Sequence, residues 1–239
     1  MYALRAHSYL NPLQLNSGVS VLPISMSRKS WKAGLTPEEF AKVRLDPRLP
    51  PLLTLARVAN ALSLSHHSLS MPMTWQTPRI RKQRTSGLLY AGAVLFEGLK
   101  VAEALKAHFG HLPQYQNGFH PILADRDVQR LRSGFLKPLR DQFTFHFDPK
   151  VPAKVLRTNE ETENVVFLSA KEENAGGTYF DIADAISIQY LIGDVSDDAE
   201  AHERLEEFMV GTSNLFNRFT IASQRLIPAA FFELGVRRL

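Results

Sequence analysis

The sequence has no cysteine among its 239 residues. It therefore excludes disulfide bonds and cysteine-ligated zinc, and it fits a reducing compartment, so we expect a cytoplasmic protein. The longest uninterrupted apolar run, Leu88–Phe96, is far shorter than the ~20 residues that a membrane-spanning helix needs. No long apolar segment follows a basic start at the N-terminus, so we expect neither a signal peptide nor a membrane partner.

Several patterns that mark common sites are also missing. The sequence contains no glycine-rich phosphate-binding loop, no Gly-x-Ser-x-Gly motif and no internal repeat. The adjacent histidines His66 and His67 have no carboxylate or third ligand at a supporting spacing. We therefore expect no metal site there and no cofactor.

Charge is distributed unevenly, although the formal net charge is only +4. The region Arg28–Arg84 contains eleven basic and three acidic residues, whereas Asn159–Glu207 contains two basic and fourteen acidic residues. A basic region suits a polyanionic partner such as RNA. The simpler interpretation, which we favour, is a solvated surface whose two regions attract each other.

The regular parts of the sequence have helical periodicity. Apolar residues recur three and four positions apart over Leu52–Leu62, Leu88–Phe109 and Leu205–Phe219, which predicts helices. The stretch Leu35–Glu39 is a helix-start signal, with Thr36 as the cap and a proline in the first turn. Either Asp197 or Asp198 is suited to cap the last long helix.

Other stretches interrupt this periodicity. Ser65–Ser86 predicts a loop, and His111–Pro121 is rich in turn-forming residues. Leu123–Phe147 predicts one long helix that is disturbed at Pro138, because proline removes an amide donor and clashes with the preceding turn. Pro228 predicts an interruption near the C-terminus.

The region after Pro149 differs in character. Val165–Ser169 reads as a strand, and Thr178–Phe180 is placed to pair with it as a hairpin before helical spacing resumes over Ile182–Tyr190. The fold class that we predict is mainly α, a helical bundle with a small β-hairpin inserted after the motif helix. We expect residues 1–25, which lack periodicity, to be a poorly ordered lead-in, and residues 26–239 to form a single helical domain.

A basic cluster with a nearby aromatic residue lies in the predicted loop. It consists of Arg79, Arg81, Lys82 and Arg84, with Trp75 upstream. Such a loop can hold single-stranded RNA by charge and base stacking. The alternative, which we favour, is an exposed linker.

The strongest candidate for chemistry is the stretch Leu136–Pro149, which contains Arg140, Asp141 and His146. An arginine supplies a permanent forked cation that matches phosphate oxygens. A histidine can take or give a proton near neutral pH. Together they suit cleavage of a phosphodiester without a metal ion.

The spacing Arg140-Asp141-x4-His146 resembles the signature of the HEPN superfamily, the higher eukaryotes and prokaryotes nucleotide-binding domain. The resemblance strictly covers about a dozen residues and loosely the region from about residue 50 to 150. It implies an α-helical, usually dimeric protein. Many members are metal-independent endoribonucleases of toxin or phage-defence systems, which implies an antitoxin or regulator as a partner. Other members bind nucleotides or have lost activity.

Helix geometry bears on how these residues meet. Six residues at ~100° each leave Arg140 and His146 ~120° apart and ~9 Å apart along one helix axis. A single helix therefore does not bring the two side chains together, whereas the dimeric sites of the family imply a cleft shared by two copies. The alternative is that Arg140 pairs with an acidic neighbour and His146 is a satisfied interior histidine.

Two functional hypotheses follow from the sequence. In the first, the protein is an endoribonuclease in which, by resemblance, His146 acts as general acid or base, Arg140 holds the scissile phosphate and Asp141 orients one of them. In the second, the protein is a non-catalytic helical nucleotide-binding or dimeric assembly protein. We expect Glu97, on the clearest predicted helix, to lie on a solvated face rather than in a cleft.

Overall fold

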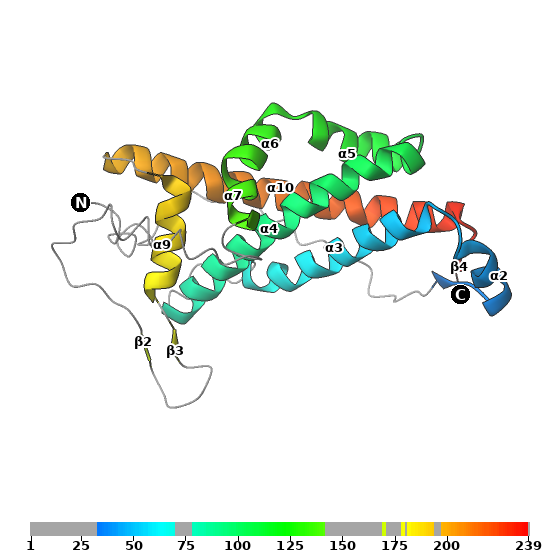
Figure 1. Cartoon of the computed structure of the whole chain (residues 1–239), viewed down its shortest axis with the longest axis horizontal. Coiled ribbons are helices and arrows are strands. Elements are labelled where there is room, and N and C mark those ends of the chain that lie inside the picture. Colours follow the sequence, from blue (N-terminus) through cyan, green and yellow to red (C-terminus); the bar gives the residue numbers. More distant parts are fainter. Residues whose placement is uncertain are drawn as a thin grey trace.

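The structure, a computed structural model, describes residues 33–69, 78–141, 169–170, 178–179, 181–193 and 197–238. Most of these residues are helical, so the mainly α prediction is confirmed (Figure 1). The helices are α2 (Pro37–Val43), α3 (Leu49–Leu69), α4 (Pro78–Phe109), α5 (Pro113–Ala124), α6 (Arg126–Leu131), the π-helix η1 (Arg132–Leu136), α7 (Lys137–Leu139), α9 (Asp181–Ile192) and α10 (Asp198–Glu233). The strands, of two residues each, are β1 (Ala33–Gly34), β2 (Ser169–Ala170), β3 (Thr178–Tyr179) and β4 (Arg237–Arg238).

The core of the bundle forms where α3, α4 and α10 pack against one another. Figure 1 shows α10 running along the length of the molecule, with α4 crossing it and α3 beside α4. The close approach depends on Gly98 of α4, because a Cβ atom there would lie 2.7 Å from the Phe219 ring of α10 and 2.9 Å from Val58 of α3. A bulkier residue at this crossing would have to push the three helices apart.

The predicted helix starts are confirmed at two places. Thr36 Oγ1 accepts a hydrogen bond from the Glu39 amide at 3.2 Å, and the Thr36 amide donates to Glu39 Oε2 at 3.0 Å, which is a complete capping box for α2. Asp197 caps α10 by accepting from the Ala199 amide at 3.0 Å. Helix α9 also covers the predicted segment.

The prediction of a loop over Ser65–Ser86 is wrong for residues 65–69 and 78–86, which are helical. Residues 70–77 lie outside the described ranges. Helix α3 continues to Leu69, and α4 already begins at Pro78. Proline was taken as a sign of a loop, but it is tolerated in the first turn of a helix, where its missing amide has no intrahelical partner.

The turn formers in His111–Pro121 were also misleading, because α5 covers most of that stretch. Its buried face consists of Tyr115, Phe119 and Ile122, and the Tyr115 hydroxyl donates to the Ala102 carbonyl of α4 at 3.0 Å. Gly118 lies inside the helix, where its missing Cβ lets Ala222 of α10 approach. Burial of an apolar face therefore outweighs the local preference for a turn.

The predicted interruption at Pro228 is wrong as well, since α10 continues through it to Glu233. The apolar stripe continues across the proline, with Leu226 and Ala230 both fully buried on either side. Packing of that stripe against the bundle stabilises the helix where the proline removes a hydrogen bond.

The long helix predicted over Leu123–Phe147 is divided in the structure. Helix α5 ends at Ala124, and Asp125 caps α6 by accepting from the Asp127 amide at 2.9 Å. A π-helical turn, η1, then precedes Pro138, so the disturbance predicted at the proline is present as a widening of the helix. Residues 142–147 lie outside the described ranges.

The hairpin predicted after the motif is confirmed in its pairing. Strand β2 pairs antiparallel with β3, with Ser169 opposite Tyr179 and Ala170 opposite Thr178. Residues 165–168 of the predicted first strand lie outside the description, as do residues 1–25 of the predicted lead-in. The single domain over residues 26–239 stays a prediction.

The two ends of the described chain meet, which the sequence did not predict. Strand β1 pairs antiparallel with β4, and Figure 1 accordingly places the C-terminus beside α2. Nearby, Arg48 Nη1 lies 2.9 Å from Glu233 Oε1, which joins the start of α3 to the end of α10. Hydrogen bonds from Arg48 lower the pKa of Asp46 to about 2.

Candidate functional site

The residues predicted to form sites lie in two separate places. Arg140 and Asp141 follow α7, whereas His146 lies outside the described residues, so its geometry relative to Arg140 stays a prediction. The backbone of the basic cluster Arg79, Arg81, Lys82 and Arg84 forms the first turns of α4 rather than a loop, and Trp75 is outside the described ranges. This cluster is roughly 20–27 Å along the α4 axis from Glu97, at 1.5 Å per residue.

Packing of α7 on α4 positions Arg140. Leu139 is fully buried, and it sits against Gly92 of α4, where a Cβ atom would lie only 2.6 Å from Leu139 Cδ2. The small glycine therefore lets the end of α7 approach the α4 backbone closely. This contact places the next residue, Arg140, beside Glu97, five positions further along α4.

Arg140 is held by two carboxylates. Its Nε lies 2.6 Å from Glu97 Oε1, and its Nη1 donates to Asp141 Oδ1 at 3.0 Å. The hydrogen bond to Asp141 and the charge of Glu97 raise the pKa of the Arg140 guanidinium above its ordinary value. The side chain is 30% exposed, so this fixed cation still reaches the surface.

The expectation that Glu97 lies on a solvated face is met in part, because its side chain is 35% exposed. Glu97 is partly buried between Arg140 and Lys100, whose Nζ lies 3.1 Å from the same Oε1 atom. Four side chains thus form a chain of alternating charge, in the order Lys100, Glu97, Arg140 and Asp141. The pairing of Arg140 with acidic neighbours is the arrangement that the alternative hypothesis anticipated.

A depression in the surface adjoins this chain of charges, between α4 and the segment that runs from α6 to Asp141. Its volume is about 430 Å³, and it is open to solvent. We call it the cationic depression; it is lined by Phe96, Lys100, Gln129, Arg132, Ser133, Lys137 and Asp141. Asp141 connects the two features, because it lines the depression and also accepts the hydrogen bond from Arg140.

Arg132 spans the two walls of the cationic depression. Its Nη1 and Nη2 donate to the two carboxylate oxygens of Glu103 on α4, at 2.5 and 2.9 Å. This forked pair lowers the pKa of Glu103 and raises that of Arg132, so both groups stay charged. The Arg132 guanidinium carbon lies 5.8 Å from the centroid of the Phe96 ring, and Lys100 Nζ lies 4.4 Å from it.

Lys137 differs from the other cations of the depression. It is exposed, and in the described part of the chain no carboxylate lies within ion-pair distance of it. The lining as a whole carries three cations against the single carboxylate of Asp141. Because Lys100 and Arg132 are each paired with a glutamate of α4, the surplus positive charge is that of Lys137.

Sequence reasoning missed Glu103, Arg132 and Lys137. A signal was present, because Arg132, Lys137 and Arg140 follow one another within nine positions of the same helical segment. What the sequence lacked was the tertiary contact that sets this segment against α4 and so brings its cations to Glu97 and Glu103.

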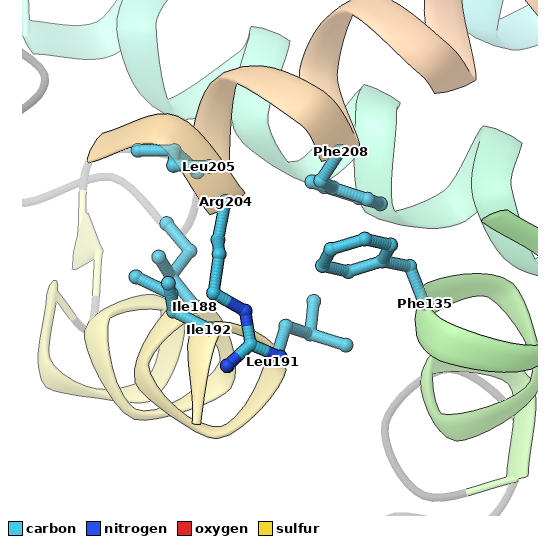
Figure 2. A pocket seen from close by; sticks show the side chains of 7 residues that line it. All are labelled: Phe135, Ile188, Leu191, Ile192, Arg204, Leu205 and Phe208. Carbon is cyan, nitrogen blue, oxygen red and sulfur yellow. The ribbon is translucent and has the colours of Figure 1, made fainter. Parts of the chain in front are cut away.

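A second hollow, shown in Figure 2, is of a different kind. It has a volume of about 10 Å³ and lies between α9, the start of α10 and η1; its lining residues are Phe135, Ile188, Leu191, Ile192, Arg204, Leu205 and Phe208. The Arg204 side chain extends beside α9, and a Cβ atom at Gly193 would lie 3.2 Å from Arg204 Nη1. Such a space holds at most one water, and its apolar walls offer few partners for one. It is a gap in packing rather than a ligand site.

Two features are absent from the described ranges. No group of three or more histidine, aspartate or glutamate side chains within these ranges is placed to hold a metal ion. None of the helices in the same ranges is both long enough and apolar enough to cross a bilayer.

Comparison with protein-family models, with curated protein sequences and with solved structures gave no significant match.

Proposed function

We propose that this protein is a metal-independent endoribonuclease that cleaves single-stranded RNA through Arg140 and His146, as its resemblance to the HEPN superfamily implies. The observation that supports this function best is the state of Arg140. It is a fixed guanidinium, kept charged by Asp141 and Glu97, and Asp141 also lines an open depression with surplus positive charge. A pre-oriented cation beside a basic surface is suited to a phosphodiester.

The proposed reaction uses the ribose 2′-hydroxyl as the nucleophile. His146 takes the hydroxyl proton, and the 2′-oxygen attacks the adjacent phosphorus while the bond to the 5′-oxygen of the next nucleotide breaks. A protonated histidine returns a proton to that leaving oxygen. Arg140 donates to the phosphate oxygens, whose charge rises in the transition state. The products are a 2′,3′-cyclic phosphate and a 5′-hydroxyl end.

A second copy of the chain is part of the proposal. On one helix the two side chains would be ~120° apart in direction and ~9 Å apart along the axis. Two chains that face each other across a two-fold axis would place Arg140 and His146 of both copies in one cleft, as the family resemblance implies. Light scattering of the purified protein should then give about twice the 26.9 kDa chain mass.

The same resemblance supports a role in a toxin–antitoxin or phage-defence system, with an antitoxin or regulator as a partner. Cleavage of cellular RNA is harmful unless it is controlled, so such a nuclease requires an inhibitor until it is needed.

One observation favours the second hypothesis, a non-catalytic nucleotide-binding or assembly protein. Arg140 pairs with Glu97 of α4 and with its own neighbour Asp141. An ion pair that only stabilises the fold, by joining the end of α7 to α4, would have the same arrangement. In that case Arg140 would contribute to stability, and the protein would bind nucleotides or a second copy without cleaving RNA.

Incubation of purified protein with a single-stranded RNA, in the presence of a chelator, distinguishes the nuclease from the non-catalytic protein. The nuclease proposal predicts cleavage, with 2′,3′-cyclic phosphate ends or their hydrolysis product identified by mass spectrometry, because no metal activates water as a nucleophile. No cleavage by a folded dimer would favour the second hypothesis. Cleavage that needs added Mg²⁺ would contradict the proposed mechanism.

A further inference from the structure

The cationic depression has the chemistry of a site for nucleic-acid phosphates. Lysine, arginine, serine and glutamine are among the side chains that contact phosphates and sugars in nucleic-acid complexes. The depression presents these four types together, from Lys100, Gln129, Arg132, Ser133 and Lys137. Its volume of about 430 Å³ falls within the ~300–1,000 Å³ typical of ligand sites.

Donors in the depression remain available for a ligand. Arg132 uses two N–H groups on Glu103, which leaves three of its five guanidinium donors without a protein acceptor among the described residues. The Ser133 hydroxyl, by contrast, already donates to the Gln129 and Arg130 carbonyls, so it offers no free donor to a phosphate. The Lys137 ammonium has no carboxylate partner among the described residues, so its N–H donors are available to a ligand.

We propose that the cationic depression is a phosphate-binding subsite for the backbone of the RNA substrate, with Lys137 as its principal contact. This inference rests on the proposed function for the identity of the substrate. Asp141 lines the depression and accepts from Arg140, so a strand whose scissile phosphate reaches Arg140 continues directly into the depression. Lys137 then contacts a neighbouring phosphate of the same strand.

The subsite recognises charge and not base identity. Phe96 is the only aromatic residue of the lining, and it is just 7% exposed beneath Lys100 and Arg132. Its face is therefore not available for base stacking, which is how sequence-tolerant sites usually hold unpaired bases. The contribution of the depression to RNA binding is expected to depend on salt and not on sequence.

Salt-dependent binding measures such a contact directly. A fluorescent, single-stranded 2′-O-methyl RNA of ~12 nucleotides suits the span of typical single-strand sites, and it cannot be cleaved because its 2′-hydroxyls are blocked. Fluorescence anisotropy at a series of salt concentrations gives the slope of log K against log [salt]. Each phosphate contact on a single strand contributes ~0.7 to that slope.

We expect Lys137→Gln to reduce the slope by ~0.7 and to weaken binding at low salt, and Lys137→Arg to retain the wild-type slope. Lys42→Gln is the matched control, because Lys42 is an exposed lysine of α2 outside the depression. It should leave the slope unchanged. Thermal midpoints of all three variants should equal that of the wild type, since both lysines are exposed.

The subsite would be overturned if the wild type did not bind the RNA, if Lys137→Gln kept the wild-type slope, or if Lys42→Gln lowered it equally. Cleavage of unmodified RNA is scored separately. Cleavage by the wild type, together with a salt slope that Lys137→Gln does not change, would contradict the subsite and support the nuclease. A salt slope that Lys137→Gln reduces, with no cleavage of unmodified RNA, would support the subsite and contradict the nuclease.

Discussion

The two walls of the cationic depression are built in different ways. One wall is α4, an uninterrupted helix of 32 residues that presents Glu97, Lys100 and Glu103 at three-residue spacing. The other is the stretch from Asp125 to Asp141, which changes from α to π geometry and back within a few residues. It supplies Arg132, Lys137 and Arg140.

The difference indicates a division of roles. The regular wall provides Glu97 and Glu103, and the irregular wall provides Arg140 and Arg132, which these two carboxylates hold. Lys137 of the irregular wall has no carboxylate partner among the described residues. A π turn is wider than an α turn and is frequent at functional sites. Here η1 directly precedes α7, and Arg140 at the end of α7 pairs with Glu97 of the regular wall, so the position of Arg140 depends on both walls.

The largest effect that tests this comparison is on stability. Leu139→Ala in the irregular wall and Leu99→Ala in α4 each truncate a fully buried leucine, so each should reduce the free energy of unfolding by ~2–5 kcal/mol. Chemical denaturation measures both. A cost below ~1 kcal/mol for Leu139→Ala alone would show that the irregular wall is not packed against Gly92 as described.

Glycine-to-alanine substitutions should change the free energy of unfolding by less, and the expected change differs between the two walls. A Cβ atom at Gly98 of α4 would overlap Phe219 and Val58, so Gly98→Ala should cost ~1–3 kcal/mol. Gly134 of η1 has no atom within 4 Å of such a Cβ, so Gly134→Ala should be neutral or stabilising by up to ~1 kcal/mol. Equal effects at the two positions would contradict the described contacts.

The smallest effect concerns the pair that joins the walls. Arg132 lowers the pKa of Glu103 in the folded state. The stabilisation from this pair is therefore fully present above the unfolded glutamate pKa of about 4.3, and it is lost as pH falls through the folded pKa. Glu103 is half exposed, so Glu103→Gln should cost under ~1 kcal/mol at pH 7. The difference from wild type, followed by thermal unfolding, should disappear at low pH. A difference that grows on acidification would contradict the pairing.

The sequence was sufficient where local chemistry decides the structure. Thr36 as a cap and the pairing of β2 with β3 were predicted from a few neighbouring residues, and the cap of α10 was narrowed to Asp197 or Asp198. It failed where tertiary packing decides. Gly118 looked like a turn residue, yet its role is to let α10 approach α5, and that need is visible only once both helices are placed.

The candidate site shows the same limit. Arg140 and Asp141 were predicted as site residues from their chemistry, and in the structure they are hydrogen-bonded to each other, with Asp141 lining an open depression. The specific pairing of Glu97 with Arg140 was not predicted, because nothing in the sequence indicates that α7 packs on α4 at Gly92. The contribution of Lys137 follows only from the absence of a described carboxylate beside it.

The most direct test of the account is the rate at which Arg140 and His146 variants cleave single-stranded RNA in the presence of a chelator. We predict that His146→Ala lowers the rate ~10²–10⁴-fold, the usual share of general acid–base catalysis, and that Arg140→Ala does comparable harm. Arg140→Lys should keep only part of the wild-type cleavage rate, because a point charge cannot replace the forked guanidinium. Thermal midpoints and light scattering establish that each variant is folded and dimeric. Full activity in both folded alanine variants would contradict the account.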